Sequence, residues 1–360
     1  MKVLMTTDNI GGVWRYSLNL ARGLRQSGID VVLVITGFPL KEHQMKELRG
    51  IQYYFIECKQ EWMEDPWQDL DEAGEWILKI AKKENVDFVH LNSFSLGALP
   101  WNVPVVMTVH SCLMSWWAEV NKDQLPDEWQ TYKTRVTTGL RAADVVVAPS
   151  RWMLNSAIAN YGLTGRTKVI YNGLNPSDYA PDTKEEYVFS MGRLWDEAKN
   201  IQKVLKAAEL TDYPIYVAGE NSHYNKVQVP RNVYFNGFLP LNEVSGWLSN
   251  ASVYLLPVKY EPFGYTFLEA ALSGCAIITG DIPTMHEIWD DAAIYVNPDD
   301  EIQIAFEVNR IMKDTEYRQK MSDRAQSRAM RYTLENMLTE YVSLYQQVVN
   351  FSRKETKTFV

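Results

Sequence analysis

Two glutamates, Glu261 and Glu269, flank the seven residues Pro-Phe-Gly-Tyr-Thr-Phe-Leu. This pattern predicts a loop that enters a helix, with Glu261 in the loop and Glu269 inside the helix. The backbone amides of Phe263, Gly264 and Tyr265 would form an open helix start, which attracts anions through unpaired N–H groups and the helix dipole. Two carboxylates there could hold one ligand at different depths. Without a ligand, the same residues could have purely structural roles: Glu261 could cap the helix, and Glu269 could be an exposed helix residue.

A second group of charges lies at the end of a predicted strand, where Arg193 follows Gly192 and Lys199 follows a few residues later. Arginine offers a planar fork of N–H donors and lysine a mobile point charge, a combination suited to a diphosphate. Ligands of open α/β sheets bind beyond the carboxyl ends of strands, which is where this turn falls. The alternative is a solvated surface pair around a helix start.

The third candidate is a glycine pair, Gly11 and Gly12, between the first predicted strand and the first helix. Because neither residue has a Cβ atom, the backbone could approach a phosphate or a sugar closely. The spacing differs from the G-x-G-x-x-G of dinucleotide-binding turns, so the motif that would best indicate a dinucleotide site is not matched here. A plain tight turn would use the same residues.

The elements that position these turns follow from the apolar pattern of the first half of the chain. Short Val-rich runs alternate with longer amphipathic stretches, which predicts βαβ units and a parallel sheet covered by helices. Strands are predicted at residues 3–6, 31–36, 88–91, 103–109 and 145–148. Helices are predicted at residues 14–24 and 70–81.

The same alternation restarts after a polar stretch, residues 175–186, whose prolines and charges are typical of a linker. Strands are predicted at residues 187–191, 215–218, 233–235, 253–257, 276–279 and 293–296, and helices at 203–210, 243–248 and 267–272. From Glu301 onward the pattern is helical, at 302–312, 315–330 and 336–349, before a charged tail at 353–357 that we expect to be loose. The predicted fold class is therefore α/β, with two doubly wound Rossmann-like domains at residues 1–174 and 175–330 and a C-terminal segment at 331–360.

The composition excludes several classes of protein. A chain of 360 residues with 46% hydrophobic and 22% charged residues is typical of a folded two-domain protein. A net charge of −9 argues against nucleic acid as a partner. Docking on a membrane stays open, since no basic cluster argues for it. The three cysteines lack C-x-x-C spacing, which argues against a disulfide framework or a zinc site and favours a reducing cytosol. The N-terminal residues predict a first strand rather than a signal peptide.

The segment Glu-Pro-Phe-Gly-x-x-x-x-Glu-Ala, followed by Gly274 and an apolar strand, resembles the signature of family 4 retaining glycosyltransferases. Other motifs of that family occur in the same order: the Gly-Gly turn, a histidine after a central strand at His110, Asn172-Gly173 before the second domain, Gly-Arg-Leu with Lys-Asn, and Gly237 after a strand. The resemblance covers roughly residues 1–345. It implies the GT-B architecture, in which two Rossmann-like domains face each other across a cleft.

The resemblance also implies a role for each matching residue. Arg193 and Lys199 would neutralise the diphosphate of a nucleotide-sugar donor. Glu269 would accept hydrogen bonds from the ribose hydroxyls, and Glu261 would orient the transferred sugar. The catalytic residues would be His110, Glu261, Arg193 and Lys199. The further donor-binding residues would be Phe263, Gly264, Tyr265 and Thr266 at the sugar and phosphate, Phe238 and Leu239 at the base, and Gly11 and Gly12 in the first domain.

The resemblance implies sugar transfer with retention, no cofactor and no catalytic metal. The acceptor would attack from the face that the nucleotide leaves, the departing phosphate oxygen would take its proton, and no protein nucleophile would be needed. The second domain would bind a UDP-, GDP- or ADP-sugar, and the first domain an unidentified glycan, lipid-linked or small-molecule acceptor. The C-terminal helix would cross back to the first domain.

Two departures from the family pattern affect these expectations. After Gly219 the family commonly shows another glycine, whereas this chain has residues Glu220 to His223, which leaves the local donor contacts open. After His110 it has an unusual aromatic segment that includes Trp116 and Trp117. Their rings could stack on an acceptor sugar or pack in the core.

Three other functions remain open on the sequence. A sugar-nucleotide epimerase and a disaccharide phosphorylase share this architecture and kind of ligand. A non-catalytic sugar-nucleotide sensor would bind the donor without turnover. The intact set Arg193, Lys199, Glu261 and Glu269 favours an enzyme over the sensor, but it does not separate the enzyme types.

Overall fold

The structure is a computed structural model, which describes residues 1–219 and 229–358. The chain divides into two compact units. The first comprises Met1–Ala118, Lys122–Asn172 and the chain from Leu334 onward, and the second comprises Glu119–Asn121 and Gly173–Thr333.

The first unit is built on a parallel sheet with the strand order β3-β2-β1-β4-β5-β6-β7. Its central strands are apolar on both faces, as helices on both sides require: every residue of β5 and β6 is buried. The strands are β1 (Lys2–Asp8), β2 (Asp30–Gly37), β3 (Gln52–Glu57), β4 (Phe88–Leu91), β5 (Val105–Thr108), β6 (Val145–Ala148) and β7 (Arg166–Val169).

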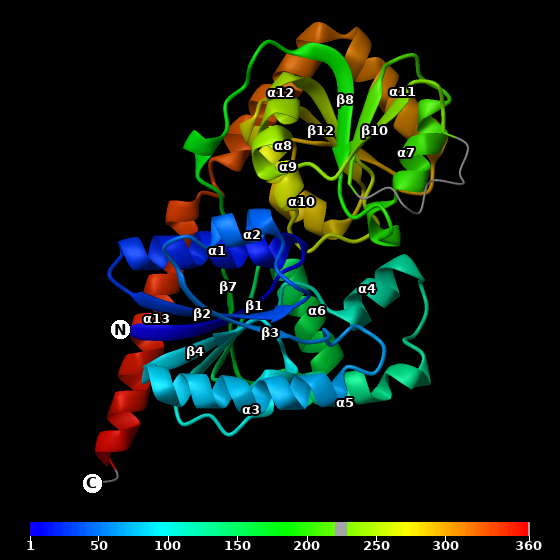
Figure 1. The fold of residues 1–360 in the computed structure, drawn as a ribbon. Coiled ribbons are helices and arrows are strands. Elements are labelled where there is room, and N and C mark those ends of the chain that lie inside the picture. The colour runs from blue at the N-terminus through cyan, green and yellow to red at the C-terminus, as the bar shows by residue number, and fades with distance from the viewer. Residues whose placement is uncertain (220–228, 359–360) are drawn as a thin grey trace. The chain divides into compact units, whose positions relative to one another are not determined.

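Helices cover both faces of this sheet. Figure 1 shows α1 (Gly11–Gln26) on one face and α3 (Trp67–Glu84) on the other. On the α3 side, Ile77 and Ile80 pack in one cluster with Leu4 from β1 and Val32 from β2. The remaining α-helices of the first part of the chain are α2 (Glu42–Glu47), α4 (Leu113–Val120), α5 (Gln130–Ala142) and α6 (Arg151–Tyr161). Short 3-10 turns lie at η1 (Ser95–Ala98) and η2 (Asp127–Trp129).

The C-terminal helix α13 (Leu334–Thr358) belongs to the first unit and is tied to it by a buried polar network. The hydroxyl of Tyr16 on α1 donates to that of Tyr341 at 2.6 Å. His90 on β4 bonds through Nδ1 to the Tyr345 hydroxyl at 2.6 Å and through Nε2 to Thr108 on β5 at 2.7 Å. All five side chains are buried, so each hydrogen bond replaces one that water would otherwise supply.

The second unit repeats the architecture with six described strands in the order β10-β9-β8-β11-β12-β13, again parallel. They are β8 (Glu185–Met191), β9 (Ile215–Ala218), β10 (Val233–Gly237), β11 (Ala251–Leu256), β12 (Ala276–Gly280) and β13 (Ile294–Val296). The helices are α7 (Ile201–Ala208), α8 (Leu241–Asn250), α9 (Tyr265–Leu272), α10 (Pro283–Trp289), α11 (Glu301–Lys313) and α12 (Thr315–Ala329), with 3-10 turns η3 (Pro176–Asp178) and η4 (Glu197–Lys199).

Both strand orders are doubly wound, which confirms the predicted fold class of two Rossmann-like α/β domains. Two local expectations were wrong. Strands β3 and β7 were not predicted. Gly11 and Gly12 lie inside the first turn of α1 rather than in a turn before it. The charged segment 353–357 lies within α13. None of the described helices has both the length and the apolar run needed to cross a bilayer.

Candidate active site

The second unit brings two separately predicted charges together. Lys199 ends η4, the turn that follows β8, and Glu261 follows β11, the neighbouring strand. The Lys199 Nζ lies 2.6 Å from the Glu261 Oε2, and the two side chains are only 15% and 12% exposed. The two charges attract each other more strongly in this shielded position than they would in water, although removing them from water has its own cost. We take the pair as the centre of the candidate site because it joins two of the predicted residues.

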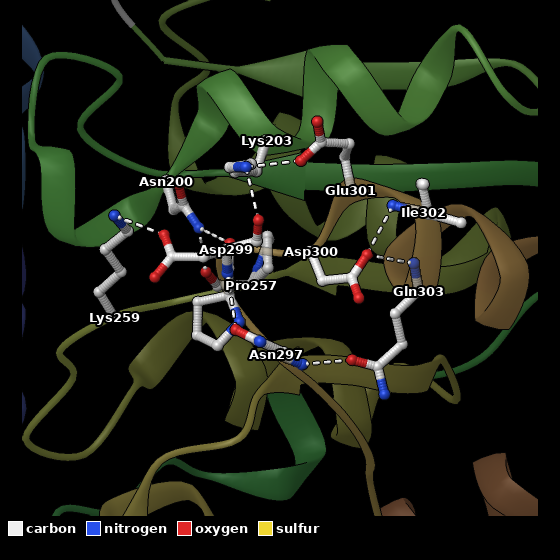
Figure 2. A network of polar contacts seen from close by, with 11 residues as sticks. Asn200, Lys203, Pro257, Lys259, Asn297, Asp299, Asp300, Glu301, Ile302 and Gln303 are labelled. Atoms are coloured by element: carbon white, nitrogen blue, oxygen red, sulfur yellow. Dashed lines mark hydrogen bonds and ion pairs between the residues drawn. The ribbon is translucent and has the colours of Figure 1, made fainter.

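The residue after Lys199, Asn200, is anchored to two other loops at the same edge of the sheet. Asn200 adopts a left-handed backbone conformation, with φ of 58°. Its side-chain Nδ2 donates to the carbonyl oxygens of Pro257 at 2.9 Å and Pro298 at 2.6 Å. Figure 2 shows this amide among the loops that follow β11 and β13. The side chain of Asn200 therefore fixes where Lys199 stands relative to the strand ends.

Two further lysines strengthen the same network. Lys203 on α7 donates to the Asp299 carbonyl at 2.6 Å and to the Glu301 Oε2 at 2.5 Å. Lys259 pairs with the Asp299 Oδ1 at 2.9 Å (Figure 2). These contacts hold the segment after β13 against α7 and against the loop that follows β11.

Arg193, directly after β8, is oriented by an acid that was not among the predicted site residues. Its Nη2 lies 2.7 Å from the Asp196 Oδ2, and the Asp196 side chain is 3% exposed whereas Arg193 is 44% exposed. The Asp196 Oδ1 accepts the Ala198 N–H and so caps η4. The guanidinium carbon also lies 5.4 Å from the ring centroid of Trp195. Asp196 thus links the orientation of Arg193 to the turn that holds Lys199.

The loop between Glu261 and α9 is shaped by Gly264. This residue has φ of +91°, and a Cβ atom placed on it would lie 2.6 Å from the Phe267 ring and 3.2 Å from the Glu261 Cγ. The Glu261 Oε1 accepts the Phe263 N–H at 3.3 Å. Gly264 is the N-cap of α9, so the amides of Phe263, Gly264 and Tyr265 lie at the helix start as predicted from the sequence.

Glu269 is 3% exposed on α9 and lies near a tyrosine that sequence reasoning missed. Burial raises the pKa of the Tyr254 phenol, a hydrogen bond with Thr266 lowers it, and the charges of Glu269 and Glu261 raise it further. The hydroxyl donates to the Met191 carbonyl at 3.1 Å. Tyr254 is therefore bonded to the end of β8 and lies within electrostatic range of both predicted glutamates. It lies inside an apolar strand, where nothing in the sequence distinguishes it from a core residue.

Phe238 and Leu239 lie farther along the same edge. They follow β10, two strands from β8, and Phe238 is 55% exposed. Their turn begins at Gly237, whose φ is +68° and whose carbonyl accepts the Gly219 N–H at 2.8 Å. Residues Glu220 to His223, the departure from the family pattern, fall outside the described residues.

In the first unit, the predicted residues follow two strands that are separated by one other strand. Gly11 and Gly12 follow β1, and His110 follows β5. The His110 Nε2 lies 2.8 Å from the Asn92 Oδ1, and Asn92 follows β4, the strand between β1 and β5. The His110 ring packs at 4.3 Å on the edge of Tyr16. Burial lowers the pKa of His110 to about 3, so the imidazole is neutral near pH 7.

The aromatic segment after His110 forms helix α4. Trp116 and Trp117 are partly buried, with ring centroids 6.2 Å apart. Within the described part of the chain, no group of three or more His, Cys, Asp or Glu side chains is placed to hold a metal ion.

Comparison with known proteins gives two family matches in succession along the chain. The model for Glycosyltransferase Family 4 matches residues 10–178, and the model for Glycosyl transferases group 1 matches residues 174–328. A relative in Methanocaldococcus jannaschii, the uncharacterized glycosyltransferase MJ1607, is 22% identical over an alignment of 388 positions, gaps included, which covers 96% of this chain and 98% of the relative.

Solved structures show the same fold. Sucrose-phosphate synthase from Thermosynechococcus elongatus superposes with a TM-score of 0.81 at 17% identity, over 96% of this chain and 98% of that one. The Anabaena protein HepE, solved in complex with UDP-glucose, has a TM-score of 0.78 at 18% identity, over 96% and 100%. The two family matches, which together span residues 10–328, show that the chain is a glycosyltransferase of Family 4 and group 1, and the solved structures show that it has the GT-B fold.

Proposed function

We propose that the chain transfers a hexosyl group from a nucleoside diphosphate sugar to an acceptor hydroxyl, with retention of anomeric configuration and without a catalytic metal. The observation that carries the proposal is the shielded Lys199–Glu261 pair, which stands beside Arg193 and the start of α9 at one sheet edge. A diphosphate is the ligand that best matches two cations and a helix N-terminus.

Each residue in this arrangement has a task during transfer. Lys199 and Arg193 compensate the charge that develops on the departing diphosphate, and Glu261 orients the sugar. The buried carboxylate of Glu269 accepts hydrogen bonds from the ribose hydroxyls. The remaining donor contacts are assigned to residues 263–266 at the sugar and phosphate, Phe238 and Leu239 at the base, and Gly11, Gly12 and His110 from the first unit.

The bond changes balance without a protein nucleophile. The acceptor oxygen bonds to the anomeric carbon on the face that the nucleotide leaves, while the bond from that carbon to the diphosphate oxygen breaks. The acceptor proton passes to the departing phosphate oxygen. Positive charge on the sugar and negative charge on the diphosphate develop together, so cations aimed at the diphosphate lower the barrier.

The division of labour follows the two units. We assign the donor to the second unit, which contains Arg193, Lys199, Glu261 and Glu269, and the acceptor to the first. HepE, a structural neighbour, was solved with UDP-glucose, which supports a nucleotide-sugar donor here.

We also assign the protein to the cytosol, because its three cysteines are buried free thiols, as expected in a reducing compartment.

A thermal-shift panel of UDP, GDP, ADP and their sugars tests the donor. A ligand present at about 100 times its Kd stabilises the native state by about 2.7 kcal/mol, so one nucleotide should raise the melting temperature clearly above the others. No shift with any member of the panel would contradict the proposal.

Product analysis then separates the alternative functions. Transfer with the donor's anomeric configuration, seen by NMR of the product and insensitive to EDTA, is the expected result. Interconversion of the sugar nucleotide without acceptor would indicate an epimerase, and a requirement for inorganic phosphate would indicate a phosphorylase. Binding without turnover on any acceptor tried would indicate a sensor.

A further inference from the structure

The hydrogen bonds around Asn92 determine which nitrogen of His110 carries the proton. The backbone N–H of Asn92 donates to the Thr6 Oγ1 at 2.8 Å, and its side-chain Nδ2 donates to the Thr6 carbonyl at 2.7 Å. Its Oδ1 lies 2.8 Å from the His110 Nε2. Asn92 is thus held between β1 and the residue that follows β5.

These contacts leave one consistent placement of protons. The Thr6 carbonyl has no proton to give, so the side-chain nitrogen of Asn92 must face it. The side-chain oxygen of Asn92 must then face His110. Because that oxygen also lacks a proton, the Nε2 of His110 must be the donor. A neutral imidazole has one proton on its two nitrogens, so Nδ1 carries the lone pair.

We propose that Asn92 is a positioning residue, which holds His110 in the Nε2–H tautomer so that Nδ1 accepts a hydrogen bond from a substrate hydroxyl. The ligand class is a sugar hydroxyl at the first unit. The catalytic part of this inference rests on the proposed function, whereas the tautomer does not.

The groups packed around His110 agree with a neutral ring. Tyr16 on α1 presents its ring at 4.3 Å, and His90 on β4 lies near enough for the two histidines to influence each other. Burial lowers the pKa of His110 to about 3. A ring that resists protonation is poorly suited to take the proton of the acceptor hydroxyl during transfer. It is well suited to accept a hydrogen bond in a fixed direction.

Nitrogen-15 NMR of the histidine side chains tests the tautomer in the ligand-free protein. We expect the His110 Nδ1 to resonate as an unprotonated nitrogen and Nε2 as a protonated one. The signals are assigned by comparison with His110→Ala. The opposite pattern in the native protein would overturn the proposal, and this measurement needs neither donor nor acceptor.

Two variants separate positioning from a merely structural role. Asn92→Leu removes the acceptor at similar size, so His110 should sample both tautomers. Asn92→Asp places a carboxylate at the Nε2, which favours the imidazolium and should make His110 titrate between about pH 5 and pH 8. Asn102→Asp, an exposed change in a loop of the same unit, is the matched control and should leave the His110 signals unchanged.

Transfer assays complete the test. We expect kcat to fall by about 10- to 100-fold in Asn92→Leu, by analogy with the loss when the outer hydrogen-bond partner of a metal-bound histidine is removed. An unchanged tautomer in Asn92→Leu would overturn the positioning role of Asn92. An altered tautomer with undiminished kcat would overturn the role of the Nδ1 in transfer. If the native protein transfers no sugar at all, the proposed function fails, while the NMR result still decides the tautomer.

Discussion

At the scale of single residues, we expect a bound ligand to replace Glu261 as the partner of Lys199. Each charge compensates the other while both side chains are largely shielded from water. Removing one partner of such a pair leaves a charge without compensation, which is costly. A diphosphate can replace the carboxylate as the partner of Lys199, and Glu261 is then available to the sugar hydroxyls.

Replacing Lys199 should therefore weaken nucleotide binding. In Lys199→Met the diphosphate loses a charge-assisted contact worth about 1.5–3 kcal/mol, so Kd for the preferred nucleotide should rise by about 10- to 150-fold. Isothermal titration measures this directly. Lys259→Met is the matched control, because Lys259 pairs with Asp299 at the same sheet edge and has no proposed donor contact. Equal losses in both variants would contradict the assignment.

Two histidines of the first unit should make the free energy of unfolding depend on pH. His90 and His110 each have a pKa of about 3, against an ordinary value of 6.5. Below pH 6.5 the unfolded chain takes up protons that the native state does not. The free energy of unfolding should then fall by about 1.4 kcal/mol per pH unit for each histidine, from full stability above pH 6.5 until pH approaches 3.

Urea unfolding at pH 7.5 and 5.5 measures this effect. His90→Gln removes one of the two groups and should show about half of the native pH dependence over this interval. Measurements at pH 7.5 and 8.5 are the control, since both histidines are neutral there in either state. A pH dependence unchanged by His90→Gln would show that this residue is not the source.

At the scale of elements, the apolar pattern predicted the central strands but missed β3 and β7. These two strands are the edges of the seven-stranded sheet. Both are partly exposed. RTKV of β7 lacks the continuous apolar run that marks a strand covered on both faces, whereas QYYFIE of β3 contains the run YYFI, which favours a strand. Only β7 therefore required knowledge of which strands form the sheet edges.

The candidate site shows the same limit of sequence reasoning. The motifs predicted that Lys199 and Glu261 lie at strand ends, but not that they touch. Their contact depends on β8 and β11 being neighbours, although β9 and β10 separate them in the chain. Asn92 and His110 meet for the same reason, because β4 and β5 are adjacent. Strand order, which no local pattern encodes, assembles both contacts.

The start of α9 offers a test at this scale. Gly264→Ala should destabilise the protein by about 1–3 kcal/mol, since the residue has φ of +91° and its new Cβ would meet the Phe267 ring. Gly246→Ala is the contrasting control: Gly246 is an exposed residue of α8 with no atom near the added Cβ, so it should stabilise by about 0.5–1 kcal/mol. Denaturation midpoints of the two variants should therefore shift in opposite directions. A stabilised Gly264→Ala would mean that the loop before α9 is not constrained as described.

At the scale of the whole molecule, the stability of the first unit depends on the C-terminal helix α13. Its residues Met337, Tyr341, Leu344, Tyr345 and Val348 are at most 3% exposed. Losing one buried aromatic side chain costs about 3–5 kcal/mol, so losing the whole set exceeds the 5–15 kcal/mol that stabilises a typical domain. The first unit should not stay folded without α13.

Truncation after Thr333 should therefore unfold the first unit and leave the second folded. In hydrogen exchange, the amides of β1 and β2 should lose their protection while those of β8 and β11 keep it, because the second unit's own sheet and core lie within residues 173–333. Nucleotide binding should persist, since the residues proposed to hold the diphosphate belong to that unit. A shorter truncation after Asn350 retains the buried residues of α13 and should leave both units protected. Protection of β1 and β2 after the longer truncation would show that the first unit does not depend on α13, whereas simultaneous loss in β8 and β11 would show that the two units fold as one.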